Sequence, residues 1–481
     1  MKKNKTLFQA FYWEMNTGDY AIEYPKEANL WQLIKERANS LAQAGITDIW
    51  LPPANKGHVG IYDVGYGSYD LWDLGEFEQK GTVRTKYGTK NELMDAISEL
   101  HNNDLRVHYD AVLNHMMGAD DTERVKLSEN SPDLPEEEVE VWTKHSYPNR
   151  DKYSQFVWNW THFNGTDWLA DRERNGLFLF EGKQWDNTYC WEDDYLMGVD
   201  FDYLNPEVRE EIKKWGCWLV NKISVNGFRL DAVRHIDVDF LDEWISELQS
   251  CTQEEIIFIG EAWFGDIKTI TDYIDAVGNS CLKAFDFPLR SAFNQLSAGE
   301  LDLRWFGGYG LVNAQGYKDK AVTFVDNHDT DRDEGGYGVE AILNRKHQAY
   351  TYILMREHGI PTVFWKDYYI YGMKEELDLL IKAREKFAYG KGHEVEANDY
   401  NNYAYVREGN EIGPGLVMMI SQSEAGGIKE MQLNAQQANT SFYDYTGNVE
   451  GKVTTDENGY GTFKVQQSAG EGWSVWVPES S

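Results

Sequence analysis

Gly227-Phe-Arg-Leu-Asp-Ala-Val-Arg-His235 is the stretch on which the interpretation of the whole chain rests. Its first four residues predict a short buried strand that ends at Asp231. Because alternate residues of a strand face the same side, we expect Arg229 and Asp231 to lie together. A guanidinium favours the ionised form of a neighbouring carboxylate, and an ionised aspartate held at a strand end is suited to act as a nucleophile. For this stretch alone, a purely structural Arg229–Asp231 ion pair is the alternative.

Seven other strand-like runs occur in the chain, and sequence with helical periodicity separates them. They cover residues 7–13, 46–51, 105–112, 256–260, 284–287, 321–325 and 362–365. Between the first two, apolar residues recur at helical spacing at Leu30, Ile34, Ala38 and Leu41. Eight strands separated by helices predict an α/β fold of the (β/α)8 TIM barrel type.

Two regions depart from this alternation. Residues from about 116 to 202 are rich in Trp, Asp and Gly, and they predict an irregular insertion after the third strand. After about residue 390, short alternating runs and turns predict a separate antiparallel β domain. We therefore expect a barrel (domain A) of residues 1–113 and 205–391, an irregular β-rich inserted domain (domain B) of residues 114–204, and a C-terminal antiparallel β-sandwich (domain C) of residues 392–481.

The composition is that of an acidic chain rich in aromatic residues. Its 481 residues include 46 Lys and Arg against 80 Asp and Glu, a formal net charge of −34. Such a surface repels phosphates, so nucleic acid and anionic membranes are poor candidate partners, and no apolar run is long enough to predict a membrane span. The 18 Trp and 29 Tyr include rings suited to stacking on sugars, although most are expected in the core.

The N-terminus and the cysteines bear on the cellular location. The segment 6–14 is too short and too polar for the apolar part of a signal peptide, which predicts a cytoplasmic protein unless a secretion signal was removed. Cysteines at positions 190, 217, 251 and 281 are scattered, which argues against a zinc site or a disulfide scaffold. Buried reduced thiols are the expectation, and two disulfides are the open alternative.

Three carboxylates follow predicted barrel strands: Asp231, Glu261 and Asp329. The C-terminal strand ends of this fold converge on one site. Retaining glycoside hydrolysis needs one ionised nucleophile and one protonated acid, roughly 5 Å apart. We expect Arg229 to keep Asp231 ionised, and the apolar run before Glu261 to raise the pKa of that carboxyl. Asp329, beside His328, is suited to bind sugar hydroxyls and to stabilise an oxocarbenium-like charge.

Two sets of residues have the chemistry of metal ligands. Asp231 and His235 could belong to a catalytic metal site, but no Cys/His cluster completes it. A separate cluster of carboxylates late in the insertion suits calcium, which prefers oxygen ligands, and a solvated acidic loop is the alternative. The cluster consists of Asp186, Asp194, Asp200 and Asp202.

Over nearly its whole length the chain resembles the α-amylase family of glycoside hydrolases. Within that family it is most similar to the bacterial liquefying α-amylases and their cytoplasmic relatives. Four motifs of the family occur in the expected order, each weak alone. They are Asp110-Ala-Val-Leu-Asn-His115, the opening stretch at 227–235, Gly260-Glu-Ala-Trp263 and Phe324-Val-Asp-Asn-His-Asp329. The segment 63–77 supports the same subgroup.

The resemblance implies a retaining, endo-acting α-amylase that cuts internal α-1,4 bonds of starch, glycogen or maltodextrins through a covalent glycosyl-enzyme. It implies that Asp231 is the nucleophile, Glu261 the acid/base and Asp329 the transition-state stabiliser. The substrate-binding residues would be Trp13, Tyr66, His115, Arg229, Arg234, His235 and His328. The calcium ligands would be Asn114, Asp194, Asp200 and the carbonyl of His235, and Asp186 and Asp202 would form an adjacent second metal cluster.

The chain departs from the family pattern at three points. Arg234 stands where Lys is usual, Asn164 replaces an Asp ligand of the second metal position, and Trp365-Lys366 replaces the usual Tyr-Gly. An α-1,4-glucanotransferase or a maltooligosaccharide-forming amylase would use the same scaffold. A non-catalytic glucan binder would be expected to lack one of the three acids. The expected partner is an α-glucan, and the chain is expected to be monomeric.

Overall fold

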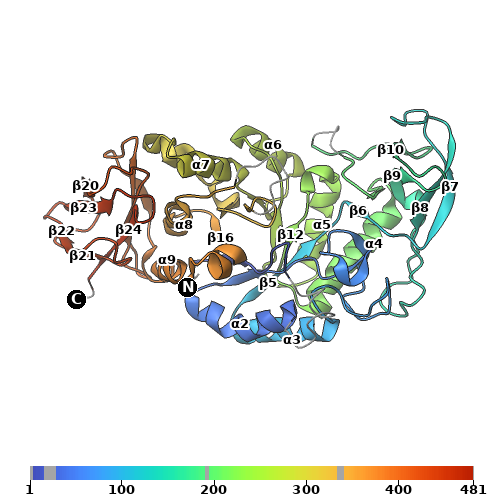
Figure 1. Cartoon of the computed structure of the whole chain (residues 1–481), viewed down its shortest axis with the longest axis horizontal. Helices are drawn as coiled ribbons and strands as arrows, with labels where there is room; N and C mark the ends of the chain where they lie inside the picture. The colour runs from blue at the N-terminus through green and yellow to red at the C-terminus, as the bar shows by residue number, and fades with distance from the viewer. Residues whose placement is uncertain (1–3, 16–28, 190–193, 333–340, 480–481) are drawn as a thin grey trace.

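The computed structural model describes residues 4–15, 29–189, 194–332 and 341–479, and a closed parallel barrel lies at its centre (Figure 1). In chain order the barrel strands are β1 (Leu7–Gln9), β2 (Asp48–Trp50), β5 (Arg106–Ala111), β12 (Gly227–Leu230), β13 (Ile257–Gly260), β14 (Leu282–Phe285), β15 (Ala321–Phe324) and β16 (Ile360–Phe364). Strand β1 pairs with both β2 and β16, which closes the barrel. The predicted barrel is confirmed.

The sixth barrel strand lies two residues earlier than predicted. The run 284–287 was expected, but β14 ends at Phe285 because Asp286 begins the next helix. The Asp286 side chain accepts the backbone N–H of Leu289 and so caps helix α7 (Phe287–Ala298). Capping of this kind satisfies helix N–H groups that have no partner within the helix.

Helices surround the barrel, and their apolar faces pack on its strands. They are α2 (Leu30–Ala44), α3 (Lys90–Asn102), α4 (Pro206–Trp218), α5 (Val238–Ser250), α6 (Ile267–Val277), α7, α8 (Lys346–Met355) and α9 (Lys374–Phe387). Helix α4 begins at Pro206 with Asn205 as its N-cap, and proline suits the first position because the N–H it lacks would have no partner there.

The inserted domain B lies at one end of the molecule, beyond the C-terminal ends of the barrel strands (Figure 1). A four-stranded sheet forms its base in the order β10 (Arg174–Leu179), β9 (Phe163–Leu169), β11 (Val199–Phe201) and β6 (His115–Met116). Strands β7 (Asp121–Lys126) and β8 (Glu138–Lys144) form a separate hairpin, and β3 (Lys56–Gly57) pairs with β4 (Ser68–Asp70) in an earlier loop. Because β6 pairs with β11, the two ends of the insertion lie together.

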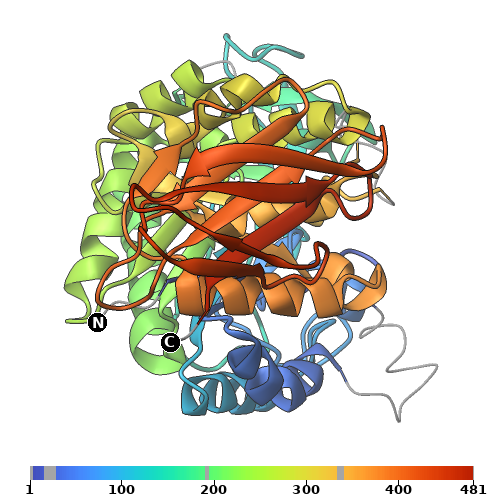
Figure 2. The ribbon, with the colours of Figure 1, turned by 90° about the vertical axis from the view of Figure 1, so that its left-hand side faces the viewer.

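Domain C covers the opposite end of the molecule and consists of antiparallel strands (Figures 1 and 2). Its larger sheet has the order β17 (Gly392–Glu394), β18 (Asn402–Arg407), β19 (Leu416–Ser421), β24 (Trp473–Pro478), β21 (Ser441–Asp444) and β22 (Lys452–Thr454). The smaller sheet pairs β20 (Ile428–Asn434) with β23 (Tyr460–Gln466).

Buried side chains bond across the boundary between domain C and the barrel. Gln348 of α8 donates to the backbone carbonyls of Ser421 at 3.3 Å and Ala469 at 3.0 Å. In the reverse direction, Arg407 of β18 donates to the carbonyls of Met355 at 3.2 Å and Arg356 at 3.1 Å. Each of these bonds ends on a backbone oxygen.

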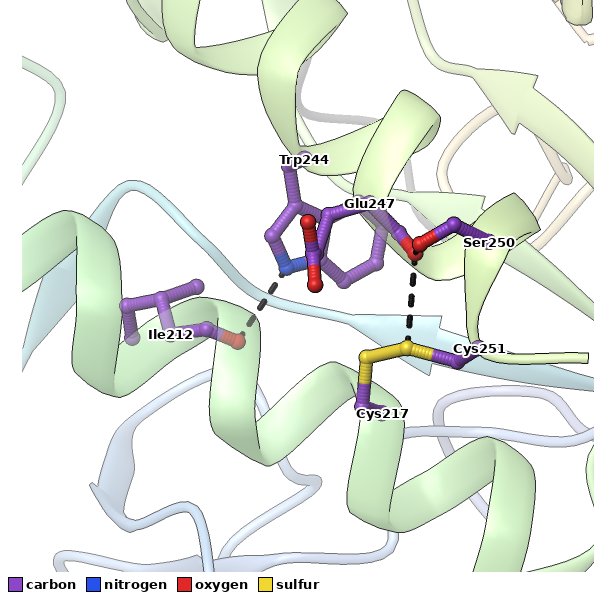
Figure 3. Close-up of a disulfide and its surroundings, with 6 residues drawn as sticks. All are labelled: Ile212, Cys217, Trp244, Glu247, Ser250 and Cys251. Carbon is purple, nitrogen blue, oxygen red and sulfur yellow. Dashed lines mark hydrogen bonds between the residues drawn. A yellow bond between two sulfur atoms is a disulfide. The ribbon is translucent and has the colours of Figure 1, made fainter.

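A disulfide joins Cys217 near the end of α4 to Cys251 just after α5 (Figure 3). Their Cα atoms are 5.9 Å apart although 34 positions separate them in sequence. The expectation of reduced thiols is therefore wrong for this pair, because packing of the two helices brings together cysteines that share no local motif. Cys281 is free, and Cys190 lies outside the described residues.

Among the helices of the described segments, none combines the length and the apolar character needed to cross a membrane.

Candidate active site

A cavity of about 230 Å³ opens at the C-terminal ends of the barrel strands. Residues from several strand ends and from domain B line it: Trp13, Tyr66, His115, Leu196, Met197, Asp231, Ala232, Arg234, His235, Glu261, Trp263, His328 and Asp329. All three predicted acids thus face one cavity. Of the residues expected to contact substrate, Arg229 is absent from this lining because it is fully buried beneath the acids.

Arg229 is the cation around which the acids are arranged. Its Nη1 lies 2.6 Å from Asp231 Oδ1 and 2.8 Å from Asp110 Oδ1, and its Nη2 lies 2.6 Å from Glu261 Oε1. One guanidinium therefore holds the carboxyl groups at the ends of β12 and β13 as close neighbours. Retaining glycosidases place a nucleophile and an acid on neighbouring carboxyl groups of one site in this way.

The backbone after Asp231 turns sharply and brings a donor to the second acid. Ala232 has φ 46° and ψ 42°, a left-handed conformation that is uncommon for a residue with a side chain. Its N–H donates to Glu261 Oε2 at 3.1 Å. The turn ends the strand at Asp231 and fixes the position of Glu261 at the same time.

Burial is the largest influence on the pKa of each acid, and it raises all three. Arg229 lowers the pKa of Asp231 through its charge and its hydrogen bond, but burial outweighs it, so the net shift of Asp231 is upward rather than downward as expected. The negative charge of Asp231 raises the pKa of Glu261 further. The charges of Glu261 and Asp231 raise that of Asp329 well above its ordinary value. Arg229 lowers the pKa of Asp231 and of Glu261 alike, and both carboxyl groups keep a net upward shift.

Three aromatic side chains, those of Trp13, Tyr66 and His328, pack together beside Asp329. The rings of Tyr66 and His328 stack with centroids 5.6 Å apart and an angle of 9° between their planes. Trp13 packs against both rings, and its Nε1 donates to Asp329 Oδ1 at 3.2 Å. Flat rings beside hydrogen-bonded carboxylates suit a ligand with apolar faces and hydroxyl edges, such as a sugar.

Two of the cavity histidines, His115 and His328, are held in the neutral form. Burial and the charge of Arg229 lower the pKa of His328 well below its ordinary value, and burial lowers that of His115 to about 4. His328 Nδ1 lies 2.9 Å from the amide nitrogen of Gln9, and His328 Nε2 lies 3.0 Å from the Tyr66 hydroxyl. These contacts assign a tautomer in which Nδ1 accepts from Gln9 and Nε2 donates. The positive charge in direct contact with Asp231 and Glu261 is therefore that of Arg229 rather than of these two rings.

Sequence reasoning missed several residues of the site. Asp110 is fully buried, contacts Arg229, and accepts a hydrogen bond from the Tyr66 hydroxyl at 2.9 Å. Asp110 is the first residue of the motif that ends at His115, and its place in that motif could have identified it as a site residue. Trp263 likewise follows Glu261 in a quoted motif, whereas Leu196 and Met197 lie in an irregular loop that carries no sequence signal.

Two departures from the family pattern have structural partners. Arg234 Nη1 donates to the Trp263 carbonyl at 3.3 Å. Lys366 is buried and lies 2.5 Å from Asp331 Oδ2 and 3.2 Å from Glu14 Oε1. Lys366 therefore ties the end of β16 to the loop that carries Asp329.

The expected calcium ligands lie at the junction of domain B with the barrel. Asp186, Asp194 and Asp200 are buried, and burial raises the pKa of each, that of Asp194 to about 7. The charge of Asp194 raises the pKa values of Asp186 and Asp200 further. Asn114 lies beside Asp200, since its carbonyl accepts the N–H of Phe201 at 3.1 Å. Asn114 Oδ1 and Asp186 Oδ1 are buried and have no hydrogen-bond partner within the described part of the chain. Buried oxygens without a donor, among carboxylates, fit a hard cation such as calcium.

Comparison with known proteins gives matches over most of the chain. The family model for the α-amylase catalytic domain matches residues 27–369, and the model for the α-amylase C-terminal domain matches residues 416–477. The chain is 39% identical to an α-amylase of Bacillus licheniformis, with 96% of this chain and 92% of that protein covered. It is 37% identical to the cytoplasmic α-amylase of Escherichia coli, with 99% of each covered.

A maltohexaose-forming relative and a solved structure extend the comparison. The chain is 38% identical to a glucan 1,4-α-maltohexaosidase of a Bacillus species, with 98% of this chain and 92% of that protein covered. The solved structure of an α-amylase from Geobacillus thermoleovorans, in complex with acarbose, superposes with a TM-score of 0.66 at 19% identity. The alignment covers 99% of this chain and 98% of that one, and it shows a shared fold.

Proposed function

Because the chain belongs to the α-amylase family of glycoside hydrolases, we propose that it is a retaining, endo-acting α-amylase. Its substrates are the internal α-1,4 bonds of starch, glycogen or maltodextrins. The observation that carries the proposal is the single buried guanidinium of Arg229, which contacts both Asp231 and Glu261. It holds a nucleophile and an acid side by side in one cavity lined with aromatic rings.

The reaction has two steps. Asp231 attacks the anomeric carbon while Glu261 gives its proton to the glycosidic oxygen, so the C–O bond breaks and the leaving sugar departs as an alcohol. The Glu261 carboxylate then takes a proton from water, which attacks the same carbon and releases Asp231. Two inversions retain the α configuration. Asp329, held by Trp13, stabilises the positive charge that develops on the sugar in both steps.

Calcium is the proposed structural cofactor. Asn114, Asp194, Asp200 and the carbonyl of His235 would hold it, and Asp186 and Asp202 would form the adjacent second metal cluster. When bound, the ion supplies positive charge that joins the insertion to the barrel. The support is the all-oxygen donor set and the two buried oxygens without partners.

A cytoplasmic location and a monomeric state complete the proposal. The similarity to a cytoplasmic α-amylase supports the location. Disulfides are rare in the cytosol, so the Cys217–Cys251 pair gives a direct test. Thiol trapping in intact cells should find both cysteines reduced if the protein is cytoplasmic, and oxidised if it is exported. Light scattering on the purified protein should give a mass of 55.6 kDa.

The decisive experiment follows maltoheptaose by proton NMR with the purified, calcium-loaded protein. Newly formed ends should appear first as the α-anomer, together with several shorter products. Glu261→Gln should abolish turnover, whereas Glu457→Gln, at an exposed position in domain C, should leave it unchanged. Fresh β-anomer would contradict Asp231 as nucleophile, and near-full activity of Glu261→Gln would contradict the assignment of the acid.

The same time course separates the alternatives on this scaffold. A glucanotransferase passes the glycosyl group to a sugar, so its products would include chains longer than the substrate. The similarity to a maltohexaosidase makes a maltohexaose-dominated product pattern the second candidate. A non-catalytic glucan binder would leave the spectrum unchanged.

A further inference from the structure

We propose that Lys366 is a positioning residue of the active site: its ammonium group joins the two chain segments that carry Trp13 and Asp329, and so keeps these two side chains in contact. The inference rests on the proposed function, because that function gives Asp329 its role in the reaction. It adds a residue that lies outside the described lining of the cavity and acts on the reaction through other side chains.

The Lys366 ammonium group lies between two carboxylates that come from distant parts of the chain. Its Nζ is 3.2 Å from both Oε1 and Oε2 of Glu14 and 2.5 Å from Asp331 Oδ2. Only 4% of the Lys366 side chain and 1% of that of Asp331 are exposed, whereas that of Glu14 is 46% exposed. A buried charge is stable only when it is paired and hydrogen-bonded, so these carboxylates hold the ammonium group in place and it holds them.

Each of these carboxylates belongs to a segment that also carries a residue of the cavity. Glu14 directly follows Trp13, and Asp331 comes two residues after Asp329. Inside the cavity, Trp13 Nε1 donates to Asp329 Oδ1 at 3.2 Å. The two segments are thus joined twice, once in the cavity by the Trp13–Asp329 hydrogen bond and once by the ion pairs of Lys366.

Hydrogen bonds fix the short loop that connects Asp329 to Asp331. Asn327 Oδ1 accepts the backbone N–H groups of Asp329 at 2.9 Å and of Thr330 at 3.0 Å. The Thr330 carbonyl accepts a hydrogen bond from buried Arg290 at 3.3 Å. Because this loop is held along its length, a displacement of Asp331 is transmitted to Asp329.

Removal of the ammonium group would leave Glu14 and Asp331 as two neighbouring carboxylates, which repel each other. Repulsion moves the two segments apart and weakens the hydrogen bond between Trp13 and Asp329. A displacement of about 1 Å at a catalytic group can cost about 100-fold in rate. The loss should appear in kcat, because Asp329 interacts more strongly with the charge of the transition state than with the bound substrate.

The test compares the kinetics of Lys366→Met and wild-type protein on maltoheptaose. The variant should lose at least about tenfold in kcat, with little change in KM. Lys213→Met is the matched control, because Lys213 also pairs with two carboxylates, Glu210 at 2.5 Å and Glu243 at 2.6 Å. These residues lie on α4 and α5, which contribute nothing to the described lining of the cavity. The control should keep the wild-type kcat.

A double-mutant cycle separates positioning from a merely structural role. Trp13→Phe keeps an aromatic ring and removes the N–H that bonds to Asp329. In this background Lys366→Met should cost a much smaller factor in kcat than in the wild-type background, because the contact that Lys366 protects is already lost. Equal fold-losses in the two backgrounds, or a wild-type kcat for Lys366→Met, would overturn the inference.

A charge reversal at Glu14 covers the case in which Lys366→Met does not fold. Glu14→Lys, at a half-exposed position, puts a second ammonium group beside that of Lys366 and should lower kcat in the same way. An unchanged kcat of this variant would contradict the inference. A wild-type protein that does not turn over maltoheptaose would overturn the proposed function and this inference with it, whereas an active wild-type protein and an equally active Lys366→Met would overturn the inference alone.

Discussion

Glu261 is the residue on which the alkaline side of the pH profile depends. Burial and the charge of Asp231 raise its pKa above its ordinary 4.5. Because the protonated form is the catalyst, kcat/KM should be retained above that pH and should fall as the pH rises through the raised pKa. The acidic side should follow protonation of Asp231. Initial rates on a maltooligosaccharide, at constant ionic strength, measure both limbs. An alkaline midpoint at or below 4.5 would contradict a shielded, protonated Glu261.

The Tyr66 hydroxyl links two parts of the site, since it contacts Asp110 and His328 at 2.9 and 3.0 Å. Tyr66→Phe keeps the ring that stacks on His328 but leaves both partners without their hydrogen bond. A loss of about 1–1.5 kcal/mol corresponds to a fall in kcat/KM of about tenfold. Tyr62→Phe, on an exposed ring of the same loop, should change nothing. Equal activity of the two variants would show that the hydroxyl does not position the site.

At this scale the sequence predicted the acids well and their surroundings poorly. Asp231 and Glu261 could be found because each directly follows an apolar run, and Asp329 because it ends the polar stretch after the run 321–325. The net pKa shift of Asp231 could not, because it depends on how far burial outweighs Arg229. The contacts of Asp110 with Arg229 and Tyr66 could not be predicted either, because they depend on the pairing of β5 with β12, which sets Asp110 beside Arg229.

The disulfide between Cys217 and Cys251 is a prediction at the scale of elements. It closes a loop of 34 residues between α4 and α5. Cys217→Ser should lower the free energy of unfolding by about 2–4 kcal/mol, and denaturant unfolding curves measure the loss. A reducing agent should destabilise the wild-type protein by the same amount and leave Cys217→Ser unaffected. Cys281→Ser removes the free thiol and should keep the response to reductant. An unchanged wild-type curve in reductant would mean that the bond does not stabilise the fold.

Elements with strong local patterns were predicted, and those that depend on pairing were not. Strand β12 has the predicted bounds because all four of its residues are buried between β5 and β13. In domain C, the alternating runs at 403–406, 415–420, 440–445, 461–465 and 473–477 predict five strands, and they do not include β17, β20 and β22. Two of these have three residues each, and β20 exposes alternate side chains, so partner strands rather than apolar runs define them.

Net charge gives a prediction for the whole molecule. A chain with a formal charge of −34 repels itself in the folded state more than in the expanded state. Added monovalent salt screens this repulsion, so Tm should rise with sodium chloride at a fixed calcium concentration. An equal osmolality of sucrose serves as the uncharged control. A Tm that stays flat or falls with salt would mean that ion pairs of the folded chain, which salt weakens, outweigh the net repulsion.

The contacts between domain C and the barrel predict whether domain C can be exchanged between members of the family. Gln348 and Arg407 bond across it to backbone carbonyls, and every amino acid supplies a backbone carbonyl. These four bonds therefore depend on the path of the main chain on the receiving side. Other contacts across the boundary, such as the Arg356–Glu394 ion pair and the stacked rings of His347 and Trp473, need particular side chains on both sides. Chimaeras that take the terminal β domain from a diverged family member should assemble, provided that the donor domain keeps the arginine and the barrel keeps Gln348. The barrel and domain C can therefore diverge in sequence at the positions that contribute only a backbone carbonyl and still remain associated.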